Sequence, residues 1–116
     1  MKKNKLSDNS NEQISDMEKF FVMDAQNAVS FLESFCENLD ALSSADMGDY
    51  EITVHGIKSA LANINETELS GLAYKLEQAA VENNFSVIRS ESPVLVDALK
   101  ALIEKLQLAS SSAGEV

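Results

Sequence analysis

The chain has 116 residues, of which 45% are hydrophobic, and a formal net charge of −10 from 19 acidic and 9 basic side chains. A chain of this length and composition can form one domain with its own core, while a strongly acidic surface repels nucleic-acid phosphates and anionic lipid. We therefore expect protein partners, with no nucleic acid and no membrane contact.

The amino-terminal residues 1–14 are polar and predict a linker or a disordered segment before a domain over 15–109. Small polar residues at 110–116 predict a frayed tail. The start of the chain lacks the apolar segment of a secretory signal, and no stretch approaches the roughly 20 apolar residues of a membrane span. We therefore expect a cytoplasmic protein.

The domain begins with two predicted helices. Ser15 and Glu18 have the spacing of a capping box and predict a short helix at the start. Asp24 is placed to cap a long amphipathic helix over 25–44. Its apolar stripe consists of Ala28, Phe31, Leu32, Phe35, Leu39 and Leu42. Cys36, the only cysteine, lies among these residues, which favours a buried structural thiol over a reactive one.

A glycine and an asparagine bound the next predicted helix, over 49–64. Gly48 interrupts the preceding pattern, and Asp49 is a candidate N-cap. The apolar positions at helical spacing are Val54, Ile57, Leu61 and Ile64. Asn65 predicts a left-handed residue that ends the helix, and hence a tight reversal at 65–67.

Two more helices complete the predicted fold. The first, over 67–83, has an apolar stripe of Leu69, Leu72, Ala73, Leu76 and Ala80. Ser92 followed by Pro93 is typical of an N-cap and a first helical residue, and predicts a last helix over 93–109 with Leu95, Leu99, Leu102 and Leu106 inward. The expected class is all-α: an antiparallel four-helix bundle with a short additional N-terminal helix. Because the fourth helix lies in the same chain, we expect a monomer.

His55 is the only histidine, and it lies one position to the side of the apolar stripe of its helix. Lys58 follows three residues later, and the neighbouring positions on that edge are small: Gly56, Ser59 and Ala62. If the chain reverses about Glu66, His55 and Glu77 stand level, since each is eleven residues from that centre. A carboxylate that accepts a hydrogen bond from one imidazole nitrogen fixes the tautomer and exposes the lone pair of the other. The pattern suits an oriented, nucleophilic histidine.

Spacing alone leaves other roles for His55 open. A histidine at the edge of a helical stripe is commonly a partly buried residue whose hydrogen bonds are satisfied by its neighbours. A metal site here would lack a second histidine or a nearby cysteine, so only carboxylates would complete it. The sequence also has no glycine-rich phosphate loop and no serine in a nucleophile elbow.

The run "HGIKSALANINETELSGLAYKLEQA" resembles the motif of histidine-containing phosphotransfer domains, which act in two-component phosphorelays. The residues that match in order and spacing are His55, Ile57, Lys58, Ala60, Ala62, Ile64, Leu69, Leu72, Ala73, Leu76, Glu77 and Ala80. The resemblance extends more loosely over 15–108. Ser59 and Asn65 depart from the motif, which has glycine at both positions; serine is still small, and asparagine tolerates the left-handed conformation.

This resemblance implies a relay function. His55 is expected to accept a phosphoryl group from a receiver-domain aspartate or a kinase and to pass it to a response-regulator aspartate. It also implies that Lys58 lies near the phosphoryl oxygens and that Glu77 orients the imidazole. The implied partners are response-regulator receiver domains and a sensor histidine kinase, with this chain either free-standing or part of a hybrid kinase. No cofactor or metal of its own is expected, and the domain is not an enzyme in the usual sense because it has no hydrolytic or kinase site.

We expect partner proteins to bind an apolar patch around His55. Its predicted members are the small residues beside the histidine and three residues of the first predicted helix: Gly56, Ser59, Ala62, Phe20, Phe21 and Met23. The alternative for the last three is that they cover the core of the bundle.

Two other functions are compatible with a small acidic helical protein. A helical adaptor would bind receiver or kinase domains without being phosphorylated, but it has no need of the set His55, Lys58 and Glu77. A carrier protein with a prosthetic arm would need a serine at a helix start in a motif such as "DSL", which neither "ISDM" nor "SSAD" matches.

Overall fold

The computed structural model describes residues 16–41 and 44–115 of the chain. This part is all-helical and contains no strand. The elements are α2 (Asp16–Glu37), the 3-10 turn η1 (Leu39–Ala41), α3 (Ser44–Asn63), α4 (Thr67–Val81) and α5 (Phe85–Glu115). The all-α class is therefore confirmed.

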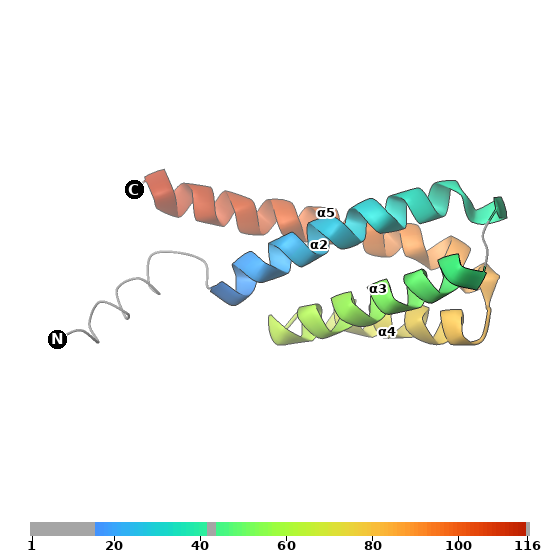
Figure 1. Ribbon diagram of the computed structural model, residues 1–116. Helices are drawn as coiled ribbons and strands as arrows, with labels where there is room; N and C mark the ends of the chain where they lie inside the picture. The colour runs from blue at the N-terminus through green and yellow to red at the C-terminus, as the bar shows by residue number, and fades with distance from the viewer. Residues whose placement is uncertain (1–15, 42–43, 116) are drawn as a thin grey trace.

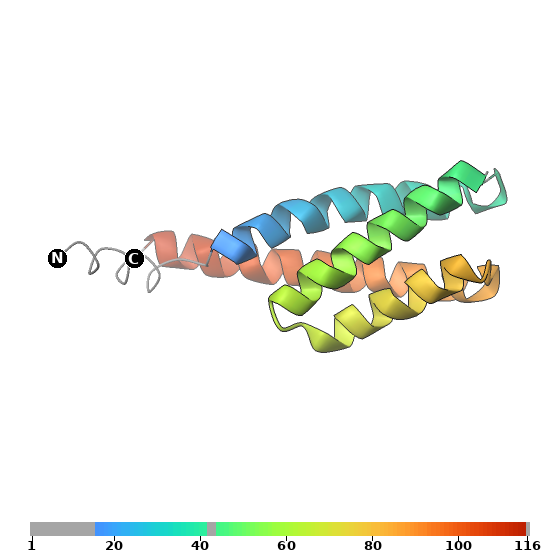
Figure 2. The same cartoon turned by 60° about the horizontal axis from the view of Figure 1, so that its bottom comes forward.

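The four α-helices pack side by side, as Figures 1 and 2 show. α2 contacts α3 and α5, and α4 contacts the same two helices, so each helix has two neighbours. This arrangement is consistent with a four-helix bundle. The first turns of α2 and the last turns of α5 extend past the turn that joins α3 to α4 (Figure 1). No helix among the described residues has the length and apolarity needed to cross a membrane.

One core is built from the apolar stripes of all four helices. Each contributes fully buried side chains, such as Leu32, Val54, Leu61, Leu76 and Leu99. Several predicted core residues are only partly buried against this cluster, namely Phe31, Leu39, Ile64, Leu69, Leu72 and Leu106. The predicted stripes are thus confirmed apart from Leu42, which lies outside the described residues.

The predicted helix boundary at Asp24 is wrong, because α2 is continuous over Asp16–Glu37 and no separate short helix precedes it within the described residues. Phe21 and Ala25 lie one turn apart, and both are buried. Packing of this stripe favours a single helix through Asp24, which is exposed and caps nothing. Ser15, the first half of the predicted capping box, lies outside the described residues.

The next boundary also differs from the prediction. α2 ends at Glu37 instead of residue 44, and α3 begins at Ser44, so Gly48 and Asp49 lie inside a helix. The exposed backbone at Gly48 leaves open space where a Cβ would stand. Tyr50, the residue after Asp49, is fully buried. A helix that begins at Ser44 includes Tyr50 in its second turn, and burial of this side chain favours that earlier start.

α5 begins at Phe85 and carries Pro93 within it, so the predicted start at Pro93 is wrong. The N-cap is Asn84, whose Oδ1 accepts a hydrogen bond from the Val87 N–H at 3.3 Å. Ser92 caps nothing; it is fully buried, and its hydroxyl pairs with the Tyr50 hydroxyl at 2.6 Å. Packing on both sides of the proline, with Ser92 buried beside it, offsets the backbone hydrogen bond that proline cannot make.

At its far end α5 continues to Glu115, beyond the predicted end at residue 109 and into the predicted tail. After Pro93 the sequence contains no second proline, and Gly114 is its only glycine. No strong helix breaker therefore precedes the last turn.

The predicted reversal at Asn65 is confirmed. Asn65 has a left-handed φ of 65°. Its N–H donates to the Ala62 carbonyl at 3.1 Å, and the Glu66 N–H donates to the Leu61 carbonyl at 2.9 Å. These two bonds form a Schellman motif, which satisfies the last carbonyls of α3 and turns the chain directly into α4.

Candidate functional site

The turn at Asn65 brings His55 of α3 beside Glu77 of α4. The imidazole Nδ1 lies 2.7 Å from Glu77 Oε2, as expected if the two residues are level across Glu66. Because an ionised carboxylate can only accept, Nδ1 carries the proton in this pair. In the neutral ring, Nε2 then has the lone pair.

Lys58 uses the other oxygen of the same carboxylate. Its ammonium Nζ donates to Glu77 Oε1 at 2.8 Å, so each oxygen of Glu77 has its own partner. The Glu77 side chain is only 13% exposed. The hydrogen bond from Lys58 lowers the pKa of Glu77 most, and the bond from His55 lowers it further, against the opposing effect of burial. Glu77 is therefore a carboxylate anion at neutral pH.

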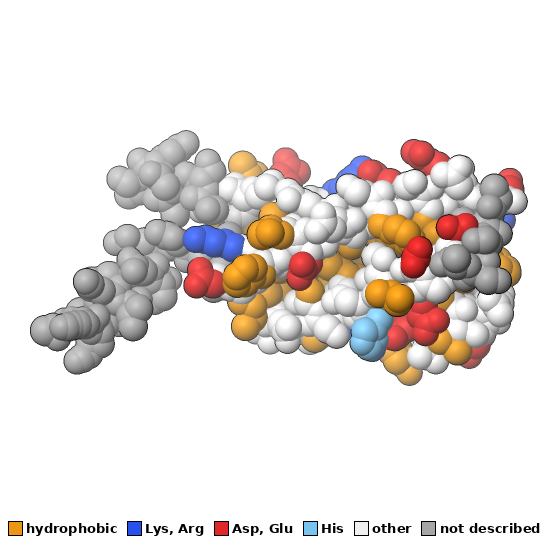
Figure 3. Space-filling model, in the orientation of Figure 1, with side chains coloured by type: hydrophobic (Ala, Val, Ile, Leu, Met, Phe, Trp, Pro, Cys, Tyr) orange, Lys and Arg blue, Asp and Glu red, His pale blue; other side chains and the backbone are white. Residues whose placement is uncertain are grey.

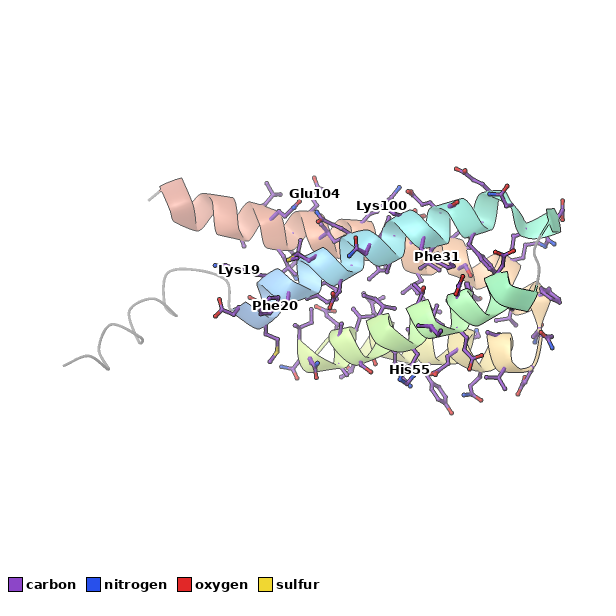
Figure 4. All side chains as sticks on the ribbon, viewed as in Figure 1. Lys19, Phe20, Phe31, His55, Lys100 and Glu104 are labelled. Carbon is purple, nitrogen blue, oxygen red and sulfur yellow. The ribbon has the colours of Figure 1, made fainter. Side chains whose placement is uncertain are left out.

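The imidazole itself faces solvent. The His55 side chain is 59% exposed, and the ring lies on the molecular surface (Figure 3). It projects from the outer side of α3, on the side of the bundle that lies away from Lys100 and Glu104 of α5 (Figure 4). Within the described residues, the bond to Glu77 is the ring's only hydrogen bond. Nε2 is thus accessible to a reactant from outside.

The small neighbours of His55 keep its surroundings open. Gly56, Ser59 and Ala62 are all exposed. A Cβ built on Gly56 would meet no atom within 4 Å, so internal packing does not require a glycine there. Ser59, which replaces the expected glycine, is exposed as well and leaves access to the ring. All three remain candidates for partner contact.

The three predicted partner residues of α2 divide into two groups. Phe20 and Met23 are 64% and 58% exposed, and both are available to a partner. Phe21 is 2% exposed and belongs to the core, so its predicted partner role is wrong. Phe21 shares an apolar stripe with Ala25, whereas Phe20 and Met23 lie off that stripe. Phe20 is displaced along the bundle from His55 (Figure 4).

Sequence reasoning missed an apolar residue nearer the histidine. Ile52, one turn before His55, is 72% exposed. It lines a surface groove of about 320 Å³ between α2 and α3, together with Asn27 and Gly56. Its position off the stripe of Val54 and Ile57 was the signal that could have identified it. Tyr74, also missed, lies one turn before Glu77 with its ring centroid 5.5 Å from Lys58 Nζ.

Two other kinds of site receive no support. Cys36 is half-buried, and burial raises the pKa of its thiol, with Glu33 and Glu37 adding to the effect. A raised pKa disfavours the reactive thiolate, which agrees with a structural role. Within 16–41 and 44–115, no group of three histidine, cysteine or acidic residues is placed to hold a metal ion.

No protein-family model, curated protein or solved structure matches this chain. The case for its function therefore rests on the geometry of His55, Lys58 and Glu77 and on the sequence motif that contains them.

Proposed function

We propose that this chain is a phosphorelay intermediate, in which His55 accepts a phosphoryl group and passes it on. The observation that carries this proposal is the 2.7 Å bond between Nδ1 of a largely exposed imidazole and a shielded carboxylate. That bond supplies what a nucleophilic histidine needs, namely a fixed tautomer, a fixed ring orientation and an accessible Nε2. The donor would be a receiver domain, through its aspartyl phosphate, or a sensor histidine kinase. The final acceptor would be a response-regulator aspartate.

The transfer step uses few groups from this chain. The Nε2 lone pair attacks phosphorus, a P–N bond forms, and the P–O bond to the donor aspartate breaks and leaves a carboxylate. The ring gains positive charge, which it shares with Nδ1–H. Glu77 faces that hydrogen and stabilises the charge as it develops. The reverse sequence of bonds delivers the phosphoryl group to the next aspartate, so the chain acts as a carrier that needs no hydrolytic or kinase site.

Lys58 has a different starting position from the one that the family resemblance implies. Its ammonium is bonded to Glu77, on the Nδ1 side of the ring. An incoming phosphoryl group carries negative charge, and an uncompensated Glu77 would repel it. We infer that Lys58 first neutralises Glu77 and then contributes attraction for the phosphoryl oxygens at short range.

The remaining parts of the proposal concern the setting of this site. The α3–α4 reversal and the side-by-side helices support an antiparallel bundle. We further take this bundle to act as a monomer in the cytoplasm. Receiver domains of response regulators, and a sensor kinase, would bind near His55, over Gly56 and the groove that Ile52 lines. A net charge of −10 makes nucleic acid and membrane unfavourable partners.

A helical adaptor that binds receiver or kinase domains without phosphorylation is the second candidate. The exposed apolar side chains Phe20, Met23 and Ile52 favour it, because they would serve docking equally well without chemistry. An adaptor function does not require the hydrogen bonds that the shielded Glu77 carboxylate accepts from His55 and Lys58, and therefore does not account for them.

Incubation with a phosphorylated receiver domain separates the two candidates. The relay predicts an acid-labile mass gain of one phosphoryl group on the parent chain and none on His55→Gln. Because His55 is 59% exposed, that variant should keep the helical circular dichroism of the parent. Binding of the receiver with no mass gain would favour the adaptor, and labelling of the variant would place the acceptor elsewhere.

A further inference from the structure

Three side chains on one face of α4 contact Lys58 of α3. They are Ser70, Tyr74 and Glu77, spaced four and three residues apart, so they lie in a row along the helix. The Ser70 hydroxyl donates to the Lys58 backbone carbonyl at 3.0 Å. The Tyr74 ring centroid lies 5.5 Å from Lys58 Nζ, and Glu77 Oε1 accepts from the same Nζ at 2.8 Å. The row thus holds both ends of the lysine.

We propose that Tyr74 is a positioning residue of the phosphotransfer site, which holds the Lys58 ammonium on Glu77 through a cation–π contact. This rests on the proposed function of His55. Tyr74 does not reach the reacting atoms in this role; it acts through Lys58.

A contact that restrains the ammonium matters for a lysine because its long side chain can adopt many conformations. Four rotatable bonds lead to the ammonium, and ordering them is opposed by conformational entropy. The Lys58 side chain is 25% exposed, so water competes with Glu77 for its three donors. An aromatic face within about 6 Å favours the ammonium without forming a directional bond. Tyr74 therefore keeps the charge of Glu77 compensated without fixing Lys58 rigidly, which leaves the ammonium able to follow a phosphoryl group.

The aromatic ring, and not the hydroxyl, carries this role. Lys58 contacts the ring of Tyr74, so the contact does not depend on the tyrosine hydroxyl. The Tyr74 residue is 52% exposed. Phenylalanine should therefore replace Tyr74, whereas a branched aliphatic residue of similar bulk should not. An exposed tyrosine that merely happens to lie near Lys58 would tolerate both changes.

The test compares Tyr74→Leu with Tyr74→Phe, and uses Phe85→Leu as a matched control at another aromatic residue that is 46% exposed. Two quantities are measured: the carboxyl pKa of Glu77, by NMR titration of its side-chain carbon, and the rate of phosphoryl transfer from a phosphorylated receiver. The titration needs no phosphoryl donor, so it tests the placement of Lys58 even if the relay function fails.

We expect Tyr74→Leu to raise the Glu77 pKa towards its ordinary value and to slow transfer about two- to fivefold, the range for one partly exposed cation–π contact. Tyr74→Phe and Phe85→Leu should match the parent chain in both measurements. Parental titration and rate in Tyr74→Leu would overturn the proposal, as would Tyr74→Phe behaving like Tyr74→Leu. Should Tyr74→Leu lose its helical signal, Tyr74→Gln removes the ring with a polar residue suited to an exposed site, and the same results decide.

Discussion

The hydrogen bond between Glu77 and His55 predicts a measurable tautomer preference, which Glu77→Ala should abolish. The bond is 2.7 Å long and joins Nδ1 to a carboxylate that is 13% exposed. Charge-assisted bonds of this kind contribute about 1.5–3 kcal/mol. The imidazole is largely solvated, so we take the lower end of that range. About 1.5 kcal/mol corresponds to roughly a tenfold preference for the Nδ1–H tautomer.

The assay is a long-range proton–nitrogen NMR correlation of the His55 ring, recorded where the imidazole is neutral. In the parent chain Nδ1 should show the shift of a protonated nitrogen and Nε2 that of an unprotonated one. Glu77→Ala should return both nitrogens to the averaged shifts of a free neutral imidazole. Averaged shifts in the parent, or identical spectra for parent and variant, would refute the orienting role of Glu77.

Glu77→Gln gives a sharper version of the same experiment. From the sequence alone this change is mild, because an amide keeps one acceptor oxygen. In the structure Glu77 has two donors to satisfy, and an amide can accept from only one oxygen. If that oxygen serves His55, the amide N–H groups face the Lys58 ammonium. We therefore expect Glu77→Gln to keep the His55 tautomer but release Lys58, and to slow phosphotransfer less than Lys58→Ala does, because the amide carries no charge that repels the phosphoryl group and the ammonium is still present.

Three other predictions follow from the described contacts. Lys58→Ala should slow phosphotransfer about ten- to thirtyfold and raise the Glu77 pKa, since Lys58 is the main cause of its lowering; an unchanged rate would make Lys58 a solvated surface charge. Burial raises the pKa of Tyr50 from 10.0 to about 12, so the contribution of Tyr50 to folding stability should be complete below pH 10 and fall by about 2 kcal/mol as pH rises to 12. Urea unfolding of Tyr50→Phe should lack this decline, and an equal decline in both proteins would contradict the assignment. Asn65→Ala should cost about 1–2 kcal/mol in the same assay because its φ is 65°, while Asn65→Gly should cost less.

The reversal at Asn65 and the pairing of His55 with Glu77 were predictable from sequence because both depend on local counting. A left-handed residue fixes the turn, and two helices of constant rise then bring residues at equal distances side by side. The apolar stripes were predictable for the same reason, since helical spacing determines which residues face the core.

The helix starts were not predictable from caps alone. Asp24, Asp49 and Ser92 each carry a side chain suited to an N-cap, yet all three lie inside helices. Burial of Phe21 favours a helix that continues through Asp24. The buried hydrogen bond between Tyr50 and Ser92 favours helices that already include Asp49 and Ser92. These tertiary contacts join segments that are far apart in sequence, so a local motif cannot reveal them.

The partner of Lys58 was equally hidden from sequence reasoning. A lysine one turn from His55 can reach either the phosphoryl position or the carboxylate that orients the ring, and spacing does not distinguish them. The structure places it on Glu77, next to the ring of Tyr74. Lys58 therefore begins as the counter-ion of the orienting group, which changes the expected effect of substituting Glu77.

Nitrogen and phosphorus NMR of the chain after reaction with a phosphorylated receiver tests the central claim most directly. If Glu77 holds the proton on Nδ1, phosphorus should be bonded to Nε2 of His55 alone, and Nδ1 should remain protonated. The signal should disappear when an unphosphorylated second receiver is added, as the phosphoryl group moves to its aspartate. Phosphorus bonded to Nδ1 or to another residue, or no phosphorylation under conditions where the receiver binds, would contradict the assignment of His55 as an oriented phosphoryl carrier.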